Sequence, residues 1–393
     1  MPTPRLTVLV DGTPLIGPRT GIGRYTHGLL TELARRDQVD VAAAGLARGA
    51  DPLVLPELPS GVPLRRTRVP GRVVLAARRL HLEPPLELLC GRSDVFHATN
   101  FLAPPMRRTA LVVTVHDLAF HTHPQTMNPA AVDLAALLPP TLRRAAAICT
   151  VTSAVRDQLT SAFDVDPDDV FVTPNAVGPE WFDAEPADAA LRARIGLPER
   201  YLVFVGTREP RKDLATLLAA HARLRAVDPG APALLVIGAG GWGTDPTVGD
   251  GAPDGVVSPG YLPQSDVVRL VAGSAALVLP SLDEGFGMPA AEALATGVPV
   301  VVSDIPALRE VTGRAAVRFP VGDPVALAET ITAVLAGSTP DRTARTAQAR
   351  RFTPESTAVA AEAAYHHAAG RHAAGRRVSR RGARRTDEID PHR

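Results

Sequence analysis

Lysine is almost absent from this chain of 393 residues. Of its 42 basic residues only Lys212 is a lysine, and the other 41 are arginines. Cysteine is nearly as rare, with Cys90 and Cys149 as the only two. Two isolated thiols indicate neither a disulfide framework nor a zinc site with paired cysteines, so we expect both to be reduced core residues.

An excess of one charge and long apolar runs are also missing. The net charge is +1, so the composition gives no general attraction to nucleic acid. No stretch approaches the ~18 apolar residues of a transmembrane helix, and the N-terminus lacks a basic region followed by a long apolar one. With 45% hydrophobic residues, the chain is expected to be a cytoplasmic, globular protein of two or three domains.

Short apolar runs bounded by turn residues occur in two series. They are continuous rather than alternating, as in parallel strands that are buried on both faces. Helix-like segments lie between many of them, which predicts an α/β fold of two Rossmann-like domains whose parallel sheets face each other across a cleft. The runs span residues 6–10, 41–46, 94–99, 110–117, 146–153 and 170–175, and then 201–207, 233–239, 256–262, 275–281, 299–304 and 316–320.

These patterns divide the chain into four parts. Residues 1–177 form the predicted first domain and residues 178–350 the second, joined near residues 175–190. Residues 351–370 contain a terminal helix that is expected to pack back on the first domain. The arginine-rich segment 371–393 is expected to be disordered, either as a solvated tail or in weak contact with anionic lipid. Nucleic acid is a poor third alternative, because no aromatic residues are interleaved with the arginines.

The single lysine lies in the segment GTREPRKDLATLL, residues 206–218. This segment follows the first strand of the second series and runs into a helix, so Arg208, Arg211 and Lys212 crowd the mouth of the predicted cleft. A helix N-terminus adds free N–H groups and partial positive charge, which favours phosphate. Lysine is a compact point charge and arginine a flat fork, so a tight turn that seats one phosphate oxygen can distinguish them. The alternative is a solvated cationic turn.

Two glutamates eight residues apart, Glu284 and Glu292, belong to the segment SLDEGFGMPAAEALATGVPVVVSD, residues 281–304. Gly285 and Gly287 allow the backbone to approach a ligand closely, and Pro289 fits the first turn of a helix. Carboxylates beside a cation cluster are good acceptors for the vicinal hydroxyls of a ribose or hexose. The alternative is one glutamate at a helix N-terminus and one on a solvated face.

Two further features lie in the first half. Gly21 and Gly23 of the turn TGIGRY would let the backbone approach a diphosphate, although a lone Gly-x-Gly is more often a plain turn. His116 follows a predicted strand, and Asp117 either orients it or belongs to a turn. A zinc site is disfavoured because no helical His-Glu pair or cysteine pair supports it, although three more histidines lie nearby: His97, His121 and His123.

Together these segments resemble family 4 glycosyltransferases, which are retaining enzymes of the GT-B fold. EGFGMPAAEA resembles their signature of two glutamates separated by seven residues, and FVGTREPRKDLATLLAAHARL resembles the phosphate-binding turn of mannosyltransferase-like members. RTGIGRYTHGLL, FHATNFLAPP, VTVHDLAFHTHP and VTPNAVGPEWF are similar to segments of the acceptor domain. The resemblance covers roughly residues 5–370. The chain departs from the family at Thr207, where an arginine is common, and at Asp213.

The resemblance implies a role for each candidate residue. Lys212 and Arg211 would hold the donor diphosphate, with Arg208 as another source of the second cation. Glu284 would bind the transferred sugar and Glu292 the ribose. His116 would touch the donor sugar. Further donor contacts are expected from the glycine-rich turns, at Gly21, Gly23, Gly285, Phe286 and Gly287.

The implied reaction transfers a hexose, with mannose from GDP-mannose first among the possible donors, to a hydroxyl of a glycan, glycolipid or polyprenyl-linked acceptor. It needs no metal and no cofactor, because fixed cations stabilise the departing diphosphate. Two other classes remain open at this point. A nucleotide-sugar epimerase of GT-B-like fold would act without an acceptor, and an NAD-dependent oxidoreductase would need the full Gly-x-Gly-x-x-Gly pattern that neither first turn has.

Overall fold

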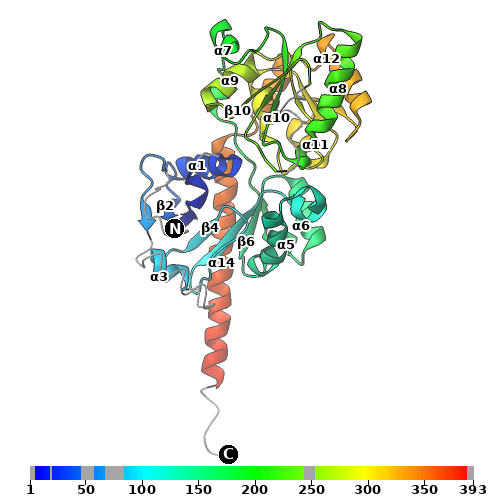
Figure 1. Cartoon of the computed structure of the whole chain (residues 1–393). Helices are drawn as coiled ribbons and strands as arrows, with labels where there is room; N and C mark the ends of the chain where they lie inside the picture. Colours follow the sequence, from blue (N-terminus) through cyan, green and yellow to red (C-terminus); the bar gives the residue numbers. More distant parts are fainter. Residues whose placement is uncertain (1–4, 18–19, 46–56, 67–83, 243–252, 387–393) are drawn as a thin grey trace, which may run out of the picture.

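The computed structural model describes residues 5–17, 20–45, 57–66, 84–242 and 253–386. These residues form two α/β domains, one above the other in Figure 1, and each contains one parallel sheet. The predicted fold class is therefore confirmed. All twelve predicted strands are present, and the only described strand that the sequence analysis missed is the short edge strand β3.

The first sheet has seven strands in the order β3-β2-β1-β4-β5-β6-β7, all parallel. The chain order reverses between β1 and β4, where the sheet has its topological switch point. The strands are β1 (Leu6–Asp11), β2 (Val39–Gly45), β3 (Leu64–Arg66), β4 (Val95–Ala98), β5 (Ala110–Val115), β6 (Ala147–Thr150) and β7 (Val170–Val172).

The second sheet has six parallel strands in the order β10-β9-β8-β11-β12-β13, and its switch point lies between β8 and β11. Ligands of such sheets bind outside the carboxyl ends of the strands at this point. The strands are β8 (Tyr201–Val205), β9 (Ala233–Ile237), β10 (Val256–Gly260), β11 (Ala276–Leu279), β12 (Val300–Ser303) and β13 (Val317–Phe319).

Helices connect these strands. In the first half they are α1 (Gly21–Leu33), α3 (Leu86–Cys90), α4 (Ala119–Thr122), α5 (Pro129–Leu142) and α6 (Ser153–Ala162). In the second half they are α7 (Ala189–Arg194), α8 (Leu214–Val227), α9 (Gln264–Ala272), α10 (Met288–Thr296), α11 (Pro306–Thr312), α12 (Pro324–Leu335), α13 (Arg342–Ala349) and α14 (Pro354–Thr386). The 3-10 turns that matter below are η1 (Thr13–Leu15), η4 (Pro179–Trp181) and η5 (Pro210–Lys212).

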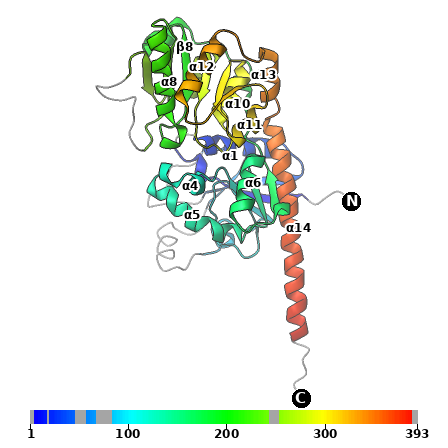
Figure 2. The same ribbon diagram turned by 90° about the vertical axis from the view of Figure 1, so that its right-hand side faces the viewer.

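Helix α14 begins beside the second domain and then packs along the first domain, against α1 and strands β1, β4, β5, β6 and β7 (Figures 1 and 2). Arg36 of the first domain pairs with Glu362 at 2.6 Å, and the hydroxyl of Tyr365 lies 2.8 Å from Nδ1 of His97. The last helix therefore ties its N-terminal half to the first domain.

The structure differs from the sequence analysis beyond residue 370. Instead of changing to disordered chain, α14 continues to Thr386, and Figure 1 shows its end projecting away from both domains. The physical reason is composition: arginine and alanine are good helix formers, and no proline interrupts the chain before Pro391. The predicted tail residues 387–393 lie outside the described residues.

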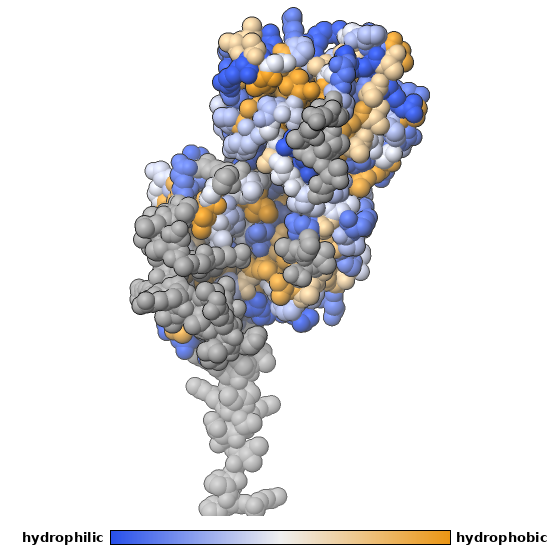
Figure 3. Space-filling view, viewed as in Figure 1, coloured by the Kyte–Doolittle hydropathy of each residue, from blue (hydrophilic) through white to orange (hydrophobic). Residues whose placement is uncertain are grey.

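The two cysteines are free and buried, as predicted. Within the described residues, every helix is too short or too polar to serve as a bilayer span. On the face shown in Figure 3, hydrophobic residues are scattered among hydrophilic ones over both lobes, and the lobes meet at a narrow waist.

Candidate active site

The turn that carries the only lysine follows the carboxyl end of β8. Residues Pro210–Lys212 form the 3-10 turn η5, and Asp213 then adopts a φ of 47°, in the left-handed region that non-glycine residues rarely enter. The carboxylate of Asp213 accepts a hydrogen bond from the backbone N–H of Thr216 at 3.4 Å and caps α8. This tight turn aims Lys212 back over the strand end.

Lys212 and Glu284 are in direct contact. Nζ of Lys212 donates to Oε1 of Glu284 at 2.6 Å, and the two side chains are 12% and 6% exposed. The hydroxyl of Ser281 donates to the same carboxylate oxygen at 2.7 Å. Glu284 follows β11, the neighbour of β8 in the second sheet, so the ion pair lies at the topological switch point.

Arg211 extends this cluster. Its Nη1 donates to the backbone oxygen of Asp283 at 2.7 Å and lies 3.5 Å from Oε2 of Glu284, while Nη2 donates to Glu209 at 2.6 Å. Burial raises the pKa of the Glu284 carboxyl, but the charges of Lys212 and Arg211 outweigh burial and leave that pKa below its ordinary value. Glu284 is therefore an ionised acceptor at neutral pH.

The second signature glutamate has a different partner. Oε1 of Glu292, on α10, lies 3.2 Å from Nη1 of Arg24, which comes from α1 of the first domain. The same Nη1 donates to Oε1 of Gln264 at 3.1 Å. Burial raises the pKa of Glu292 to about 7, although Arg24 lowers it, and Glu180 adds a smaller increase. Burial therefore favours the protonated form of Glu292 more than that of Glu284.

Replacing Glu292 by glutamine is expected to stabilise the fold at alkaline pH. Burial raises the pKa of Glu292 in the folded protein to about 7, above the ordinary value of a glutamate. The folded state then binds more protons, so stability is lost as pH rises through this window. Glu292→Gln removes that loss, which is about 3 kcal/mol at most. Thermal unfolding should show a higher Tm for the variant than for the wild type at pH 8, and this difference in Tm should become smaller towards pH 5. The same difference in Tm at both pH values would contradict the raised pKa of Glu292.

His116 lies at the end of β5 and is buried and neutral. Its Nε2 donates to the backbone oxygen of Thr99 at 2.7 Å, and burial lowers its pKa. The ring stands edge-on to Tyr25, with 5.1 Å between the ring centroids. Asp117 accepts a hydrogen bond from the N–H of Ala119 at 3.2 Å, so it acts as a turn residue at the start of α4.

The two glycines between the glutamates allow close packing, Gly285 against the first domain and Gly287 within the second. A Cβ on Gly285 would lie 1.7 Å from the backbone oxygen of His116, so only glycine permits this approach. The backbone oxygen of Gly285 also accepts a hydrogen bond from the hydroxyl of Thr152 at 2.9 Å. Gly287 has a φ of 84°, and a Cβ there would lie 2.3 Å from Leu308. Both glycines serve close packing around the site.

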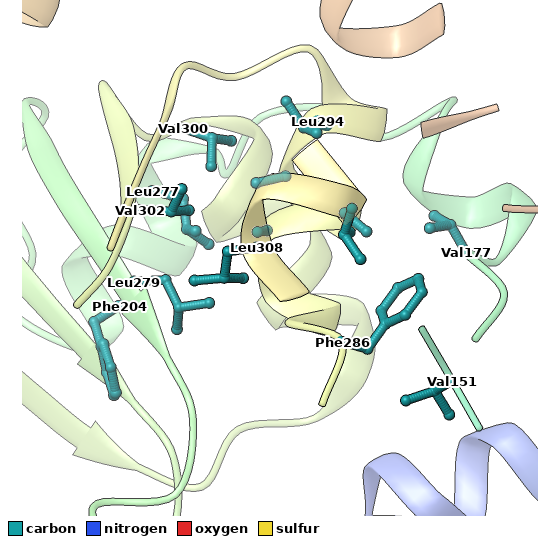
Figure 4. Close-up of a cluster of buried hydrophobic side chains, with 14 of the residues drawn as sticks. Val151, Val177, Phe204, Leu277, Leu279, Phe286, Leu294, Val300, Val302 and Leu308 are labelled. Atoms are coloured by element: carbon teal, nitrogen blue, oxygen red, sulfur yellow. The ribbon is translucent and has the colours of Figure 1, made fainter. Parts of the chain in front are cut away.

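Phe286, between these glycines, is a core residue. Its side chain is buried, and its ring lies beside Val151 and Val177 (Figure 4) and edge-on to Phe352 at 5.1 Å between centroids.

Three predicted site residues remain to be described: Gly21, Gly23 and Arg208. A Cβ on Gly23 would lie 2.7 Å from the backbone oxygen of Pro14, so close packing of α1 on η1 accounts for that glycine, whereas a Cβ on Gly21 would meet nothing within 4 Å. Nη1 of Arg208 donates to the hydroxyl of Ser258 on β10 at 2.7 Å. The structure therefore joins Lys212 to Arg211 and Glu284, and it directs Arg208 towards β10.

A pocket of about 960 Å³ lies between the domains on the Glu292 side. Its wall combines α1 with η4, α9, α10 and the start of α14, and it includes Gly21, Arg24, Gln264 and Glu292. Lys212 and Glu284 are not among its lining residues. The structure thus holds the cation and the first carboxylate in tight contact, and it leaves open space beside the second carboxylate.

The sequence analysis missed several residues of the site. Arg24 belongs to the turn TGIGRY, but no spacing in the sequence links it to Glu292. Ser281 and Glu209 are polar residues that belong to no recognisable motif. Glu310 of α11 also escaped notice: its carboxylate accepts from the N–H groups of Ser153 and Ala154, at 2.8 and 3.0 Å, and caps α6 of the other domain. Such contacts follow from the meeting of two domains, which no local pattern reveals.

The four histidines that suggested metal have separate partners. His97 lies between Tyr365 and the hydroxyl of Thr114. His121 packs on Phe163, and His123 lies 3.7 Å from a carboxylate oxygen of Asp283. Among the residues described by the structure, no cluster of three or more metal-ligating side chains is found.

Two glycosyltransferase families match the chain, one in each half. Residues 19–181 match the family described as Glycosyltransferase Family 4, and residues 199–337 match Glycosyl transferases group 1. The second match covers the whole second sheet, and the first covers every strand of the first sheet except β1.

Curated relatives cover most of the chain. O-antigen chain mannosyltransferase B of Escherichia coli is 30% identical over 337 residues, which are 81% of this chain and 87% of the relative. D-inositol 3-phosphate glycosyltransferase of a Nocardioides species is 28% identical over 400 residues, or 88% and 86% of the two chains.

Solved structures share the fold. Sucrose-phosphate synthase from Thermosynechococcus elongatus superimposes with a TM-score of 0.66 at 19% identity, and covers 92% of this chain and 98% of its own. HepE of Anabaena, in complex with UDP and glucose, gives a TM-score of 0.63 at 18% identity, with 90% and 97% covered.

Proposed function

The chain belongs to glycosyltransferase family 4 and is a nucleotide-sugar-dependent hexosyltransferase, and we propose that it is a retaining enzyme that transfers mannose from GDP-mannose to a hydroxyl of a glycan, glycolipid or polyprenyl-linked acceptor. One observation carries the proposal, the contact between Lys212 and Glu284 at the switch point of the second sheet. A diphosphate needs a fixed cation there, and a sugar needs an ionised acceptor beside it.

Lys212 is proposed to bind the donor diphosphate. An ammonium has three N–H donors, so Lys212 can keep its bond to Glu284 and still donate to a phosphate oxygen. Its positive charge would stabilise the nucleoside diphosphate as it leaves. Arg211 would support this role by holding the loop, because its two Nη atoms already donate to Glu209 and to the backbone of Asp283.

The two carboxylates are proposed to bind the two sugars of the donor, the transferred hexose and the ribose. Glu284 is ionised and would accept hydrogen bonds from hydroxyls of the transferred hexose. Glu292, beside the open pocket, would accept those of the ribose. His116 would contact the donor hexose from the first domain, because its backbone already lies against Gly285.

The proposed reaction proceeds on one face of the sugar. The bond from the anomeric carbon to the diphosphate oxygen breaks, and a bond from the same carbon to the acceptor oxygen forms. The acceptor proton passes to the departing phosphate, so no protein nucleophile is required. The contacts between the domains would exclude water from this step.

The donor base and sugar rest on the relatives. The names of two of them, O-antigen chain mannosyltransferase B and MMP alpha-(1->4)-mannosyltransferase, support mannose, whereas HepE was solved with UDP and glucose. A thermal-shift panel with GDP, UDP, dTDP and their sugars tests the choice. We expect GDP and GDP-mannose to raise Tm most, and to give a mannosylated product with retained anomeric configuration when an acceptor is added.

The outcomes of this panel are distinct. A preference for UDP or dTDP compounds would overturn the donor but keep the class of enzyme. Stabilisation by none of the nucleotides would overturn the proposed function. A changed nucleotide sugar in the absence of any acceptor would show an epimerase instead.

We also propose weak peripheral contact with an anionic membrane through the end of α14. Residues 371–386 contain seven arginines and no acidic residue. In Figures 1 and 2 this part of the helix projects away from both domains. Each cation near an anionic bilayer contributes about 1 kcal/mol, and this attraction would hold the enzyme beside a lipid-linked acceptor.

Truncation after Ala374 is expected to weaken binding to vesicles that contain anionic phosphatidylglycerol by at least about tenfold, because it removes six of these arginines. Vesicle co-sedimentation at low and high salt measures the effect, with neutral phosphatidylcholine vesicles as the control. Equal binding of the full and the truncated chains would contradict membrane contact, and salt-sensitive binding to nucleic acid alone would point to a different partner.

A further inference from the structure

The structure leaves the predicted second cation of the diphosphate site unassigned. Family members often carry an arginine where this chain has Thr207, and Arg211 and Arg208 were the predicted substitutes. Both Nη atoms of Arg211 donate to protein oxygens, and Arg208 donates to Ser258 on β10. A nucleoside diphosphate carries at least two negative charges, so Lys212 alone would leave part of that charge without a partner.

Arg24 is a cation at the right place on the opposite domain. It lies in the first turn of α1, whose N-cap is Thr20. Its Nη1 makes the contacts to both Glu292 and Gln264, so one atom of the fork serves both partners across the domain boundary. Its Nε, like that of Arg211, is buried and has no hydrogen-bond partner among the described residues. The side chain is 32% exposed and lines the pocket of about 960 Å³.

The side chain of Arg24 is partly exposed to the pocket, so its guanidinium can donate to a phosphate group. An arginine fork can bind two phosphate oxygens at once. The neighbour, Glu292, is the residue proposed to bind the ribose, and in any nucleoside diphosphate the first phosphate is attached to that ribose through a single carbon. A ribose bound at Glu292 would therefore place the first phosphate about one ribose length from that carboxylate, a distance that the long side chain of Arg24 can span.

We propose that Arg24 is a donor-binding residue that supplies the second cation of the diphosphate site from the first domain. The inference rests on the proposed function and extends it. Arg24 already contacts Glu292 and Gln264 of the second domain, so its guanidinium is in place before a donor binds. A nucleoside without phosphates would lack the group that this guanidinium binds.

The other charges around the pocket are mostly negative. Besides Arg24, the lining has one other arginine, Arg35, and five glutamates: Glu32, Glu57, Glu180, Glu292 and Glu355. Arg35 is exposed and pairs with Glu32 at 3.5 Å. Among the described lining residues, Arg24 is therefore the cation best placed to pair with a phosphate.

The test compares Arg24→Gln with Arg35→Gln, a matched change on the same helix and in the same pocket. Isothermal titration with GDP and with guanosine measures the two affinities for each chain, or UDP and uridine if the wild type prefers uracil. We expect Arg24→Gln to weaken binding of the diphosphate by about 10- to 100-fold, the range for a hydrogen bond to a charged group, and to leave nucleoside binding unchanged. Arg24→Lys, which keeps the charge but not the fork, should recover part of the affinity.

Three results would overturn the inference. Unchanged diphosphate affinity in Arg24→Gln would show that the guanidinium does not reach phosphate. An equal loss for nucleoside and diphosphate would show that Arg24 acts only by holding Glu292. A similar loss in Arg35→Gln would show a general effect of pocket charge. If the wild type binds none of the diphosphates, the proposed function itself fails, which separates the two failures.

Discussion

Replacing Lys212 by arginine is expected to reduce sugar transfer by about 100-fold or more, although the charge is kept. Nζ of Lys212 already lies 2.6 Å from Glu284, and the side chain is largely buried. A Cβ on Gly206 would come within 3.9 Å of its Cε, so the turn passes close to the lysine stem. A flat guanidinium is larger than an ammonium and cannot hold the carboxylate and a phosphate oxygen from one atom. Loss of one hydrogen-bond donor that stabilises the charge of the departing diphosphate lowers the rate of transfer by about this factor.

The matched control is Arg194→Lys, the reverse exchange at an exposed ion pair with Asp266. Transfer from the donor selected by the thermal-shift panel should be normal in this control, and both variants should unfold near the temperature of the wild type. Near-normal turnover of Lys212→Arg would show that the site does not distinguish the two cations, and the singular lysine would then have no functional explanation.

Replacing Gly285 by alanine is expected to abolish most transfer by keeping the domains apart. The new Cβ would lie 1.7 Å from the backbone oxygen of His116, and a backbone atom cannot rotate away as a side chain does. The domains must separate to relieve the clash, which breaks the bond between Thr152 and Gly285 and moves His116 away from the donor site. Initial rates and small-angle scattering should show a large loss of activity together with a larger radius of gyration.

Gly370→Ala serves as the control for this variant. Gly370 lies within α14, and a Cβ there would meet no atom within 4 Å. Alanine is the better helix former, so this change should leave activity normal and stability equal or slightly higher. A Gly285→Ala enzyme with normal rates and an unchanged radius of gyration would refute the close approach of the two domains.

The strands could be predicted because burial on both faces leaves a simple trace, a continuous run of apolar residues. Every run identified on this basis is a strand, including the short β13 (Val317–Phe319). The edge strand β3 (Leu64–Arg66) escaped because three residues with two arginines carry no such run. Parallel sheets with switch points then place the turns after β8 and β11 side by side, which is why local motifs located Lys212 and Glu284 correctly relative to each other.

The partners of the site residues could not be predicted. The contact of Arg24 with Glu292 joins residues 268 positions apart, and it exists only because two domains meet. The prediction for the end of helix α14 was wrong for a different reason. Its charge suggested disorder, whereas the propensities of arginine and alanine extend the helix to Thr386. A high net charge indicates that a segment does not pack into a core. It does not indicate whether the segment is helical.

Because Lys212 is the only lysine, one resonance reports on the proposed diphosphate site. In protein labelled with ¹³C at the lysine Cε, the full chain gives a single side-chain signal. The account predicts that this signal shifts on titration with GDP or GDP-mannose, or with the uracil or thymine compound if the panel selects it, and stays in place with the free nucleoside. If calorimetry shows that a diphosphate binds but the lysine signal does not shift, the central claim that this ammonium binds the donor would be contradicted.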